Sequence, residues 1–486
     1  MKLSDILKGT DIKTDSKMEI KGITTSSKEV SDNFIFFAIK GEKTDGNLYI
    51  DEAIKNGAKV IISQNKIENR NVISFRTSDI LKTLSVASKN FYNNPSSKMK
   101  IIGITGTKGK TTVATLIQKV LNTTTNTGLI GTINYRTHNQ VISPAQNTTP
   151  LPHKLHKILS IMLENEEKCV VLEVSSHSLK LKRVDDIEFD CAGFTNLTSD
   201  HMDFHKTKQD YINSKAKLFE ILESSPKKEK IAVLNLDDEF SDVVSPKIKT
   251  ARIISYSLKK FSDIRATDIK LEMNTSVFKL DVFGKIVEIK TKLIGIHNVY
   301  NIMCAFACAY DIVKDVQKIV GAIEEIENIP GRLEKIESKT GFCVFIDYAH
   351  TEDSLRQVLI TLNQIPHRKI ITVFGCGGDR DKTKRPLMGH VSEKLSDFVI
   401  ITSDNPRSED PLKIISDIEN GMTQKNKYII EPDREKAIKK AIEIASKGDI
   451  ILIAGKGHED YQIIGDKKIH FSDRECVMKY LKIYNL

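Results

Sequence analysis

Short apolar runs recur along the chain, and most of them are followed by a polar loop and then by hydrophobic residues at helical spacing. Such runs occupy 59–62, 101–104, 169–172, 344–346, 370–374, 398–401 and 450–454. After the run at 344–346, the residues at helical spacing are Leu355, Val358, Leu359 and Leu362. Strands that alternate with helices predict an α/β protein with mostly parallel sheets.

The pattern divides the chain into three blocks. The chain has 486 residues, more than one hydrophobic core usually supports, so several domains are expected. The turn-rich segment 93–97 (Asn-Asn-Pro-Ser-Ser) reads as a linker, and Pro330-Gly331 reads as a second break. The predicted domains are therefore 1–97, 98–330 and 331–486.

In the third block, polar residues follow four of the predicted strands. In a parallel sheet, ligands bind outside the carboxyl ends of the strands. The loops leaving the four strands carry Asp347 and His350, Asp379 and Arg380, Asp404 to Arg407, and Lys456 to Glu459. The sequence therefore predicts a binding site at this edge of the sheet.

A glycine-rich loop follows the run at 101–104 and precedes a helix that would bury Val113, Leu116, Ile117, Val120 and Leu121. The loop consists of Gly106, Thr107, Lys108, Gly109, Lys110, Thr111 and Thr112. Backbone N–H groups at such a turn and at a helix N-terminus bind phosphate, and we expect Lys110 to reach the β- and γ-phosphates.

The loop departs from the full P-loop spacing, because the residue five positions before Gly109 is Ile104 rather than glycine. A glycine-rich turn with a surface lysine is the alternative. The loop lies between a predicted strand and a predicted helix, which favours phosphate binding.

An acidic residue, Glu173, ends the run at 169–172. Alone it could be a solvated strand end. Beside a phosphate loop, an acid at a strand tip commonly holds Mg²⁺ directly or through water, and the hydroxyl of Thr111 is a second oxygen ligand. Thr111 and Glu173 are therefore candidate metal residues.

Composition narrows the class of protein. Hydrophobic residues make up 40% and charged residues 28%, and the net charge of +9 is spread along the chain without a basic block. This pattern favours a solvated surface over nucleic-acid binding. The seven cysteines form no CxxC pair, which argues against a disulfide framework or a zinc site. No signal peptide or apolar run of membrane-spanning length is visible, so we expect a cytoplasmic protein without membrane insertion.

The motifs occur in the order and spacing seen in the Mur ligases, and the chain resembles this family along essentially its whole length. The segments that carry the resemblance are 106–112, 173–177, 200–205, 297–301, 331–332 and 347–350. The resemblance implies an N-terminal UDP-binding α/β domain, a central P-loop ATPase domain and a C-terminal Rossmann-like domain. Thr25, Ser27, Lys28 and the loop 41–46 are similar to the tripeptide-synthetase branch, the MurE type.

The resemblance also implies a reaction. ATP would phosphorylate a carboxylate of UDP-N-acetylmuramoyl-L-alanyl-D-glutamate, and the amine of meso-2,6-diaminopimelate would then displace phosphate. By resemblance, the UDP-precursor residues are Thr25, Ser27, Glu42, Lys43, Thr44, Asn147, Thr148, Thr149, Ser175, Leu181 and Arg183. Leu181 stands where this branch often has a polar glutamine. Asn298, Asn301, Asp347 and His350 resemble adenine-nucleotide residues, and Arg332 resembles an arginine near the phosphates.

The family implies two Mg²⁺ ions, and two further residues resemble ligands of these ions. His201 lies in Asp-His-Met-Asp-Phe-His at 200–205, a segment that the residues alone would suggest is structural. Lys215 matches the lysine that the family carbamylates to N6-carboxylysine, which turns an ammonium into an anion. Lys217 is two residues away, and without the resemblance both lysines read as solvated helix residues.

The choice of amino acid rests on Asp404, Asn405, Pro406 and Arg407. The segment could be a simple Asn-Pro turn. It also matches the family motif for diaminopimelate, whose second carboxylate suits the planar fork of Arg407. By resemblance, Arg380, Gly455 and Glu459 hold the same amino acid.

Other hypotheses remain open at this stage. They are a lysine-adding Mur ligase, a ligase similar to folylpolyglutamate synthetase, a nucleotide-regulated binding module and, more distantly, a nucleic-acid ATPase. The predicted protein is a monomer that uses ATP and Mg²⁺.

Overall fold

The structure is a computed structural model that describes residues 1–486 except 42–43, 68–71, 199–206 and 273. The chain divides into two compact units, which we describe separately. Unit 1 comprises residues 1–265, 281–285 and 300–322, and unit 2 comprises 266–280, 286–299 and 323–486.

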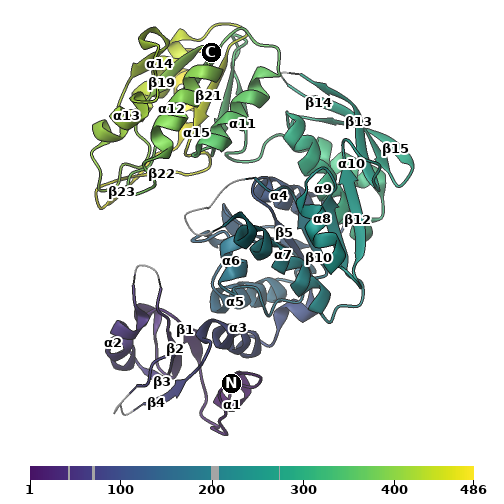
Figure 1. The fold of residues 1–486 in the computed structure, drawn as a ribbon, viewed down its shortest axis with the longest axis vertical. Helices are drawn as coiled ribbons and strands as arrows, with labels where there is room; N and C mark the ends of the chain where they lie inside the picture. The colour runs from purple at the N-terminus through teal and green to yellow at the C-terminus, as the bar shows by residue number, and fades with distance from the viewer. Residues whose placement is uncertain (42–43, 68–71, 199–206, 273) are drawn as a thin grey trace. The chain divides into compact units, whose positions relative to one another are not determined.

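Unit 1 begins with a small parallel sheet of order β1-β2-β3-β4 (Figure 1). The first elements are α1 (Leu3–Ile6), β1 (Gly22–Thr24), η1 (Ser27–Glu29), β2 (Phe34–Ala38), η2 (Gly46–Tyr49), α2 (Ile50–Lys55), β3 (Ala58–Ser63), β4 (Ile73–Arg76), α3 (Ile80–Phe91) and η3 (Pro95–Lys98). Alternate residues of β2 face opposite sides, so that Phe37 packs with α1 and α3 while Phe36 packs with α2. Helices therefore cover both faces of this sheet.

The second sheet has the order β15-β14-β13-β12-β11-β10-β5-β9-β6-β7-β8. Its strands are β5 (Lys100–Thr105), β6 (Thr127–Ile130), β7 (Asn134–Arg136), β8 (Val141–Pro144), β9 (Cys169–Glu173), β10 (Cys191–Phe194), β11 (Ile231–Asn235), β12 (Arg252–Ser257), β13 (Ile264–Leu271), β14 (Ser276–Val282) and β15 (Lys285–Thr291). Its helices are α4 (Lys110–Leu121), α5 (Pro152–Glu164), α6 (Ser176–Lys180), α7 (Lys208–Ser224), α8 (Phe240–Val244), η4 (Ser245–Lys247), α9 (Ile296–Val313) and α10 (Val316–Glu324).

The centre of this sheet is parallel, from β12 through β11, β10, β5 and β9 to β6. The hydrophobic side chains of α5 and α7 pack on one face, while α4 contacts β5, β6 and β9. The predicted helix residues Val113, Leu116, Ile117, Val120 and Leu121 are all buried in α4, which confirms the predicted helix face. The parallel arrangement brings the carboxyl ends of β10, β5, β9 and β6 to one edge.

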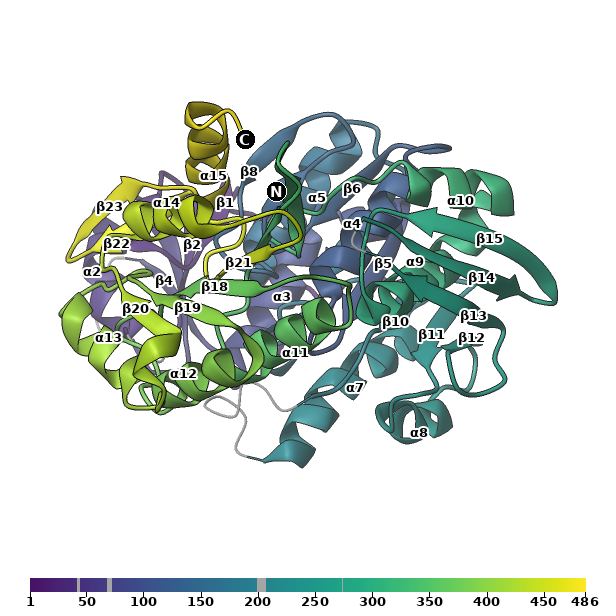
Figure 2. The same ribbon diagram turned by 90° about the horizontal axis from the view of Figure 1, so that it is seen from above.

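Unit 2 contains a six-stranded sheet of order β16-β17-β21-β18-β19-β20 (Figure 2). Its elements are β16 (Glu334–Glu337), β17 (Cys343–Asp347), α11 (Glu352–Asn363), β18 (Ile370–Phe374), α12 (Lys384–Leu395), β19 (Phe398–Ile401), α13 (Pro411–Glu419), η5 (Lys425–Lys427), β20 (Tyr428–Ile430), α14 (Arg434–Ile444), β21 (Ile450–Ala454), β22 (Tyr461–Ile464), β23 (Lys467–His470) and α15 (Asp473–Ile483). Only β16 is antiparallel to its neighbour in this sheet.

The unit 2 sheet lies between two layers of helices. Side chains of α11, α12 and α13 pack on one face, and side chains of α14 and α15 pack on the other. The strands β17, β18, β19 and β21 end at the same level of the sheet. Ala454, the last residue of β21, pairs with Asp347 at the end of β17 and with Phe374 at the end of β18. Phe374 in turn pairs with Ile401 at the end of β19. The four polar loops predicted from the sequence therefore leave the same edge.

These elements confirm the predicted α/β class and its parallel sheets, and seven predicted strands correspond to β3, β5, β9, β17, β18, β19 and β21. The linker prediction at 93–97 needs correction. Asn93 and Asn94 do form a turn with positive φ, but Pro95 and Ser96 are buried and Asn94 donates a hydrogen bond to Glu188 at 2.6 Å. The segment is thus a packed part of unit 1. The boundaries of the three predicted domains stay a prediction.

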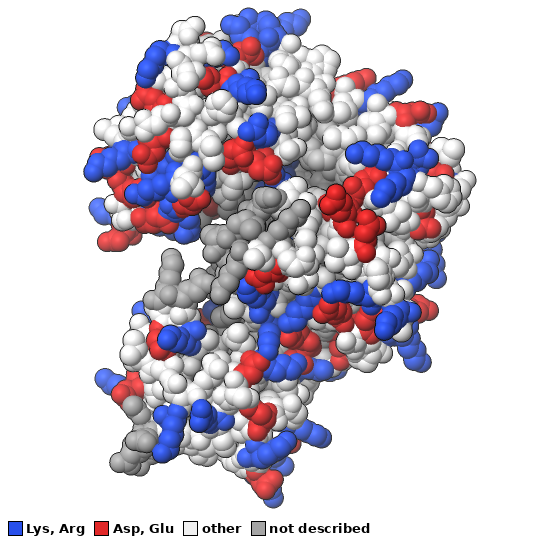
Figure 3. Space-filling view, viewed as in Figure 1, with Lys and Arg blue, Asp and Glu red and all other residues white. Residues whose placement is uncertain are grey.

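The surface and the cysteines agree with the expected character of the chain. Both charge signs are interspersed over the face shown in Figure 3. All seven cysteines are buried, as expected for small hydrophobic residues in apolar runs. Among the described residues, the helices are all too short or too polar to span a lipid bilayer.

Candidate functional site

The phosphate loop connects β5 to α4 in unit 1. Gly109 is the N-cap of α4 with φ of 83°, a conformation that glycine adopts readily, and Gly106 has φ of 147°. A Cβ on Gly106 would overlap Thr195, and one on Gly109 would overlap Asn301. Both positions therefore need glycine so that the loop can lie against neighbouring residues while the first turn of α4 presents its N–H groups.

A segment after β10 holds the loop in place. The N–H groups of Thr107 and Lys108 donate to the backbone and side-chain oxygens of Asn196 at 2.7 and 3.0 Å. Thr195 and Asn196 in turn donate to the Lys108 carbonyl at 2.6 and 3.1 Å. Tyr211 adds a hydroxyl contact of 3.0 Å to Thr107. None of these three supporting residues was predicted from the sequence.

Two lysine side chains converge on the loop. The Nζ atoms of Lys110 and Lys215 both donate to the Gly106 carbonyl, at 2.9 and 2.6 Å, and Lys110 also donates to the Thr107 carbonyl at 2.9 Å. Lys215 is only 1% exposed, although it was expected on a solvated helix when the residues were read alone. Lys217 instead points elsewhere and pairs with Asp185 at 3.0 Å. The structure thus distinguishes Lys215, which reaches the phosphate loop, from Lys217, which does not.

A buried carboxylate lies beside the loop. Glu173 at the end of β9 is fully buried and accepts hydrogen bonds from the hydroxyl groups of Thr111 and Thr132, at 2.9 and 3.0 Å, and from Thr132 N at 2.9 Å. Thr132, which follows β6, was not predicted. Oxygen donors of this kind are the ligands that Mg²⁺ prefers.

These oxygens fit a magnesium ion only as part of its ligand set. Thr111 and Glu173 supply two of the six oxygens that Mg²⁺ usually takes, and water and phosphate commonly supply others. Among the described residues, no group of three or more His, Cys, Asp or Glu side chains could hold a metal ion. The predicted ligand His201 lies outside the described residues.

Four predicted precursor residues lie around Glu173. Thr149 donates its hydroxyl to the Glu173 carbonyl at 2.7 Å, and Arg183 donates to the Thr149 carbonyl at 2.8 Å. Burial lowers the pKa of Arg183. The hydroxyl groups of Thr148 and Thr132 lie 3.1 Å apart, and Ser175 N donates to the Thr149 hydroxyl at 3.2 Å.

The remaining precursor residues are more dispersed. The Asn147 carbonyl accepts from the Tyr135 hydroxyl at 2.6 Å, and half-buried Leu181 ends α6. Ser27 is buried and donates to Glu52 at 2.7 Å, Thr25 is half-buried, and Thr44 is exposed. The predicted residues Glu42 and Lys43 lie outside the described part of the chain.

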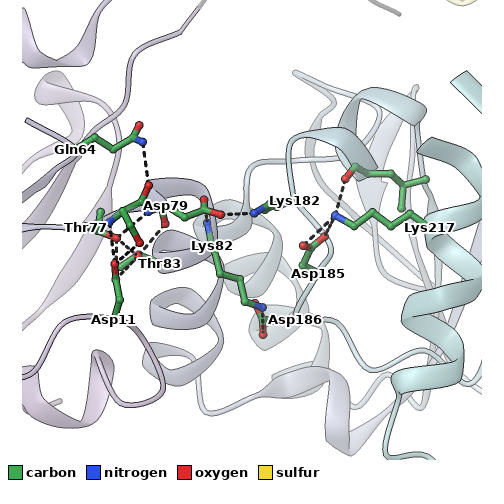
Figure 4. A network of polar contacts seen from close by, with 12 residues as sticks. Asp11, Gln64, Thr77, Asp79, Lys82, Thr83, Lys182, Asp185, Asp186 and Lys217 are labelled. Atoms are coloured by element: carbon green, nitrogen blue, oxygen red, sulfur yellow. Dashed lines mark hydrogen bonds and ion pairs between the residues drawn. The ribbon is translucent and has the colours of Figure 1, made fainter. Parts of the chain in front are cut away.

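Lys154 on α5 connects the N-terminal segment to the segment that carries Asn147. Its Nζ donates to Glu29 at 2.9 Å and to Gln146 at 3.3 Å. A second set of charged residues, from Lys182 to Asp186, extends this connection (Figure 4). Lys182 contacts Asp79, and Asp186 accepts from Lys82 at 3.1 Å.

In unit 2, the predicted amino-acid loop is held by the hairpin β22–β23. Ile463 N donates to the Asn405 side chain at 3.0 Å, Arg407 N donates to the Ile463 carbonyl at 3.0 Å, and Gln462 donates to the Asp404 carbonyl at 2.5 Å. Asp404 and Asn405 are buried, while Arg407 is half-buried. The sequence analysis did not predict this hairpin.

The loop after β18 packs directly on the same residues. Arg407 Nη1 donates to the Gly378 carbonyl at 2.7 Å, and Gly378 N donates to the Asn405 carbonyl at 2.9 Å. A Cβ on Gly378 would overlap the carbonyl of Pro406. Arg380, also predicted to hold the amino acid, is exposed, and its Nη1 makes a long contact of 3.5 Å to the Asp379 carbonyl.

A buried arginine supports both loops. Arg385 is fully buried and binds Glu409 with two nitrogens, at 2.9 and 3.0 Å, and these bonds hold the pKa of Glu409 down to about 2. Glu409 also accepts from Asp379 N at 2.6 Å. Neither Arg385 nor Glu409 was predicted from the sequence.

The loop after β21 carries the last of the predicted amino-acid residues. Gly455 has φ of 115°, and a Cβ there would lie 3.3 Å from the Asp404 carboxylate. Glu459 accepts from the Asn405 side chain at 3.0 Å, and burial raises the pKa of Glu459. The Asp404–Arg407 loop and the Gly455–Glu459 loop therefore meet at the carboxyl end of the sheet, as predicted.

Comparison with known proteins agrees with this arrangement. Three family models match the chain: the Mur ligase family catalytic domain at 19–108, the Mur ligase middle domain at 104–309, and the Mur ligase glutamate ligase domain at 331–457. A UDP-N-acetylmuramoyl-L-alanyl-D-glutamate--2,6-diaminopimelate ligase of Caldanaerobacter subterraneus subsp. tengcongensis is 42% identical over 99% of both chains. The chain belongs to the Mur ligase family.

Two other Mur ligases show the same similarity. A protein of the same name from Clostridium perfringens is 42% identical, over 99% of this chain and 100% of its own. A solved structure, also named UDP-N-acetylmuramoyl-L-alanyl-D-glutamate--2,6-diaminopimelate ligase, is 30% identical with a TM-score of 0.71 and covers both chains completely.

The residues expected around the nucleotide lie in both units of this Mur ligase. Asn301 of unit 1 abuts Gly109 of the phosphate loop. In unit 2, Asn298 is buried and donates to the Ile294 carbonyl at 2.9 Å, and Asp347 accepts from Leu333 N at 2.7 Å. Asp347 thereby fixes the backbone beside Arg332.

Aromatic groups surround Arg332 in unit 2. Its guanidinium lies 5.0 Å from the ring centre of Tyr348, which is 4.7 Å from the ring of His350 and 5.1 Å from that of His458. Burial raises the pKa of Tyr348 to about 12 and lowers the pKa of His458 to about 4, the latter also through Arg332. At neutral pH, the rings of Tyr348 and His458 are therefore uncharged, and Arg332 packs against the first of them.

Proposed function

We propose that this Mur ligase uses ATP to join meso-2,6-diaminopimelate to UDP-N-acetylmuramoyl-L-alanyl-D-glutamate in peptidoglycan synthesis. The observation that carries the proposal is the Asp404–Arg407 loop, which brings a half-buried arginine together with the buried carboxylate of Asp404 and the half-buried carboxylate of Glu459 in unit 2. Such a set suits the far end of diaminopimelate, which bears both a carboxylate and an ammonium. The names of the similar proteins support the same substrate pair.

The first step is phosphoryl transfer. A carboxylate oxygen of the precursor attacks the γ-phosphorus of ATP, the bond to the β-phosphate oxygen breaks, and ADP leaves. Unit 1 would supply the groups for this step: the N–H groups at the start of α4 and the ammonium of Lys110, which donates to the Gly106 carbonyl, lie at the loop proposed to bind phosphate. Positioning and charge neutralisation are the main contributions of a protein to this chemistry.

The second step forms the amide. An unprotonated amine of the amino acid attacks the acyl carbon of the acyl phosphate, the carbon–oxygen bond to phosphate breaks, and the amine loses its second proton to solvent. In unit 2, Arg407 would hold the distal carboxylate, and Glu459 would accept from the distal ammonium. These contacts orient the amino acid so that its other amine is available for the attack.

Mg²⁺ completes the proposal. Thr111 and Glu173 would hold one ion, and Lys215, as a carbamate, together with His201 would hold a second. Bound Mg²⁺ neutralises negative charge on the transferred phosphoryl group. Lys215 supports this role through its burial next to Gly106, because a carbamate there would lie at the phosphate loop.

A single product analysis tests the proposal. The purified chain is incubated with UDP-dipeptide, ATP, Mg²⁺ and an equal mixture of meso-diaminopimelate, lysine and glutamate, and the product is identified by mass spectrometry. We expect a diaminopimelate adduct, formed with one phosphate released per product. A lysine or glutamate adduct would show a different amino-acid specificity, and phosphate release without any adduct would favour a nucleotide-regulated binding module. The monomeric state and a cytoplasmic location stay predictions.

A further inference from the structure

Lys456 is a completely buried lysine at the centre of the unit 2 loops, and the sequence placed it in a loop of the predicted site without giving it a role. Its Nζ atom donates to Glu459 at 3.3 Å and to the Asn405 side-chain oxygen at 3.4 Å, and it lies 3.6 Å from Asp404 Oδ1. It also donates to the Tyr461 carbonyl. The ammonium is therefore enclosed by oxygen atoms from two loops and from the first residue of β22.

The charges around Lys456 do not cancel. The side chains of Asp404 and Glu459 are only 9% and 16% exposed, and together they carry two negative charges when ionised. Lys456 supplies one positive charge to the pair. Two carboxylates that share a buried site without a cation cannot both stay ionised, because the charged forms repel each other and lose their hydration.

We infer that Lys456 is a positioning residue that balances one of the two neighbouring carboxylate charges, orients Glu459 and leaves this trio one surplus negative charge for an ammonium of the amino acid. The inference rests on the proposed function and deepens it. Lys456 itself need not touch the substrate. It acts through Glu459, the group proposed to accept from the distal ammonium.

The hydrogen bonds give the same lysine a second effect, on orientation. The side-chain oxygen of Asn405 accepts hydrogen bonds from Lys456 Nζ and Ile463 N. Its side-chain nitrogen donates to Glu459 at 3.0 Å. Lys456, Asn405 and Glu459 thus form a closed triangle. Loss of the ammonium would leave one side of the triangle unmade and would allow Glu459 to turn away from the substrate.

Other ionisable groups of unit 2 add smaller electrostatic effects. Burial raises the pKa of Glu459, and the charge of Lys456 opposes that rise. Arg434 is fully buried, but it binds Asp473 at 2.7 Å and therefore has its own counter-ion. The charged or titratable groups that act on Asp404, Glu459 or the neighbouring Tyr461 also include Arg407, Arg434, Tyr348 and Cys376.

The test compares Lys456→Met with Lys468→Met. Lys468 is a matched control, because its Nζ lies 3.8 Å from the ring centre of the same Tyr461 but the residue is exposed. At pH 7.5 we expect Lys456→Met to raise KM for diaminopimelate by about 30-fold. KM for ATP should stay within about 2-fold of the parent, and Lys468→Met should change neither value.

The pH profile distinguishes positioning from a merely structural role. The ratio of kcat/KM for Lys456→Met to that of the parent should rise steadily from pH 6 to pH 9, because Glu459 ionises at higher pH without its cation. Substrate titration cancels in this ratio. Lys456→Gln, which keeps a hydrogen-bonding group without the charge, should show the same rise and serves if the methionine variant does not fold.

A loss that is equal at every pH, or an equal loss in Lys468→Met, would overturn the inference. The result is separable from the proposed function, because the profile can be measured with whichever amino acid the parent uses. If the parent adds lysine instead, the proposed substrate is wrong, and the pH-dependent effect of Lys456 is then measured with lysine.

Discussion

Replacing Arg407 by alanine tests how the amino acid is selected. Arg407 Nη1 donates to the Gly378 carbonyl at 2.7 Å, which fixes the guanidinium in the site. Within the described residues, the edge formed by Nε and Nη2 makes no recorded hydrogen bond, so it is the face that we expect to bind a carboxylate with two parallel bonds. Diaminopimelate has that carboxylate at its far end, and lysine lacks it.

The expected magnitude follows from these two bonds. Each hydrogen bond between charged groups contributes about 1.5–3 kcal/mol, and solvent access to a half-buried arginine places the pair near the lower end, at about 3–4 kcal/mol. Arg407→Ala should therefore lower kcat/KM for diaminopimelate by about 10²- to 10³-fold. With lysine as substrate, we expect a change of less than about 5-fold, since no carboxylate is there to lose its partner.

The assay measures kcat/KM for both amino acids in the parent, in Arg407→Ala and in two comparison variants. Arg407→Lys keeps the charge without the planar fork and should fall between parent and alanine. Arg356→Ala, which removes a half-buried ion pair with Glu352 within α11, should behave as the parent. A parent that prefers lysine, or an alanine variant that keeps the parent's preference, would refute the assignment of Arg407.

Two further predictions concern the supporting geometry. Lys215→Ala should lose at least about 100-fold in kcat and recover part of it with added formate or acetate. Lys217→Ala, which loses the ion pair with Asp185 and a hydrogen bond to the Leu179 carbonyl, should stay within about 5-fold. Equal losses in the two variants would contradict the separation seen on α7. Gly378→Ala should lower the free energy of unfolding by about 1–3 kcal/mol, because the added Cβ must displace the Pro406 carbonyl. The same shift should raise KM for diaminopimelate and leave KM for ATP unchanged. Thermal denaturation and steady-state kinetics measure the two effects, and an unaltered KM for the amino acid would show that the loop tolerates the shift.

Much of the fold follows from local sequence patterns. The strands β18, β19 and β21 begin and end where their apolar runs do, because strands of a covered parallel sheet bury both faces and so read as continuous hydrophobic segments. The hairpin β22–β23 could not be found in this way. Its residues are mostly polar or exposed, and the structure holds it through hydrogen bonds to Asn405 and Arg407, more than fifty residues earlier in the chain.

The residues of the candidate site likewise fall into those with a local sequence signal and those without one. Residues that act within one loop, such as Lys110 or Arg407, carry a local signal in their motif. Supporting residues act across the sheet: Asn196 reaches the phosphate loop because β10 lies beside β5, and Thr132 reaches Glu173 because β6 lies beside β9. A prediction of β6 and β10 as parallel strands would have placed both residues at the correct edge, since polar residues follow each of them.

Two lysines in similar loops show why motif matching alone does not explain selectivity. Lys110 and Lys456 are both lysines in glycine-containing loops, yet Lys110 lies in the phosphate loop of unit 1 while Lys456 faces two carboxylates in unit 2. We expect the first to act on the phosphates of ATP, and the second to set the charge that an incoming amino acid must match. Amino-acid selection should therefore change through residues 404–407 and 455–459 without loss of ATP binding. Measured KM values for ATP in Arg407→Ala and Lys456→Met should accordingly equal that of the parent, and a parallel rise in both variants would show that the two functions are not separable.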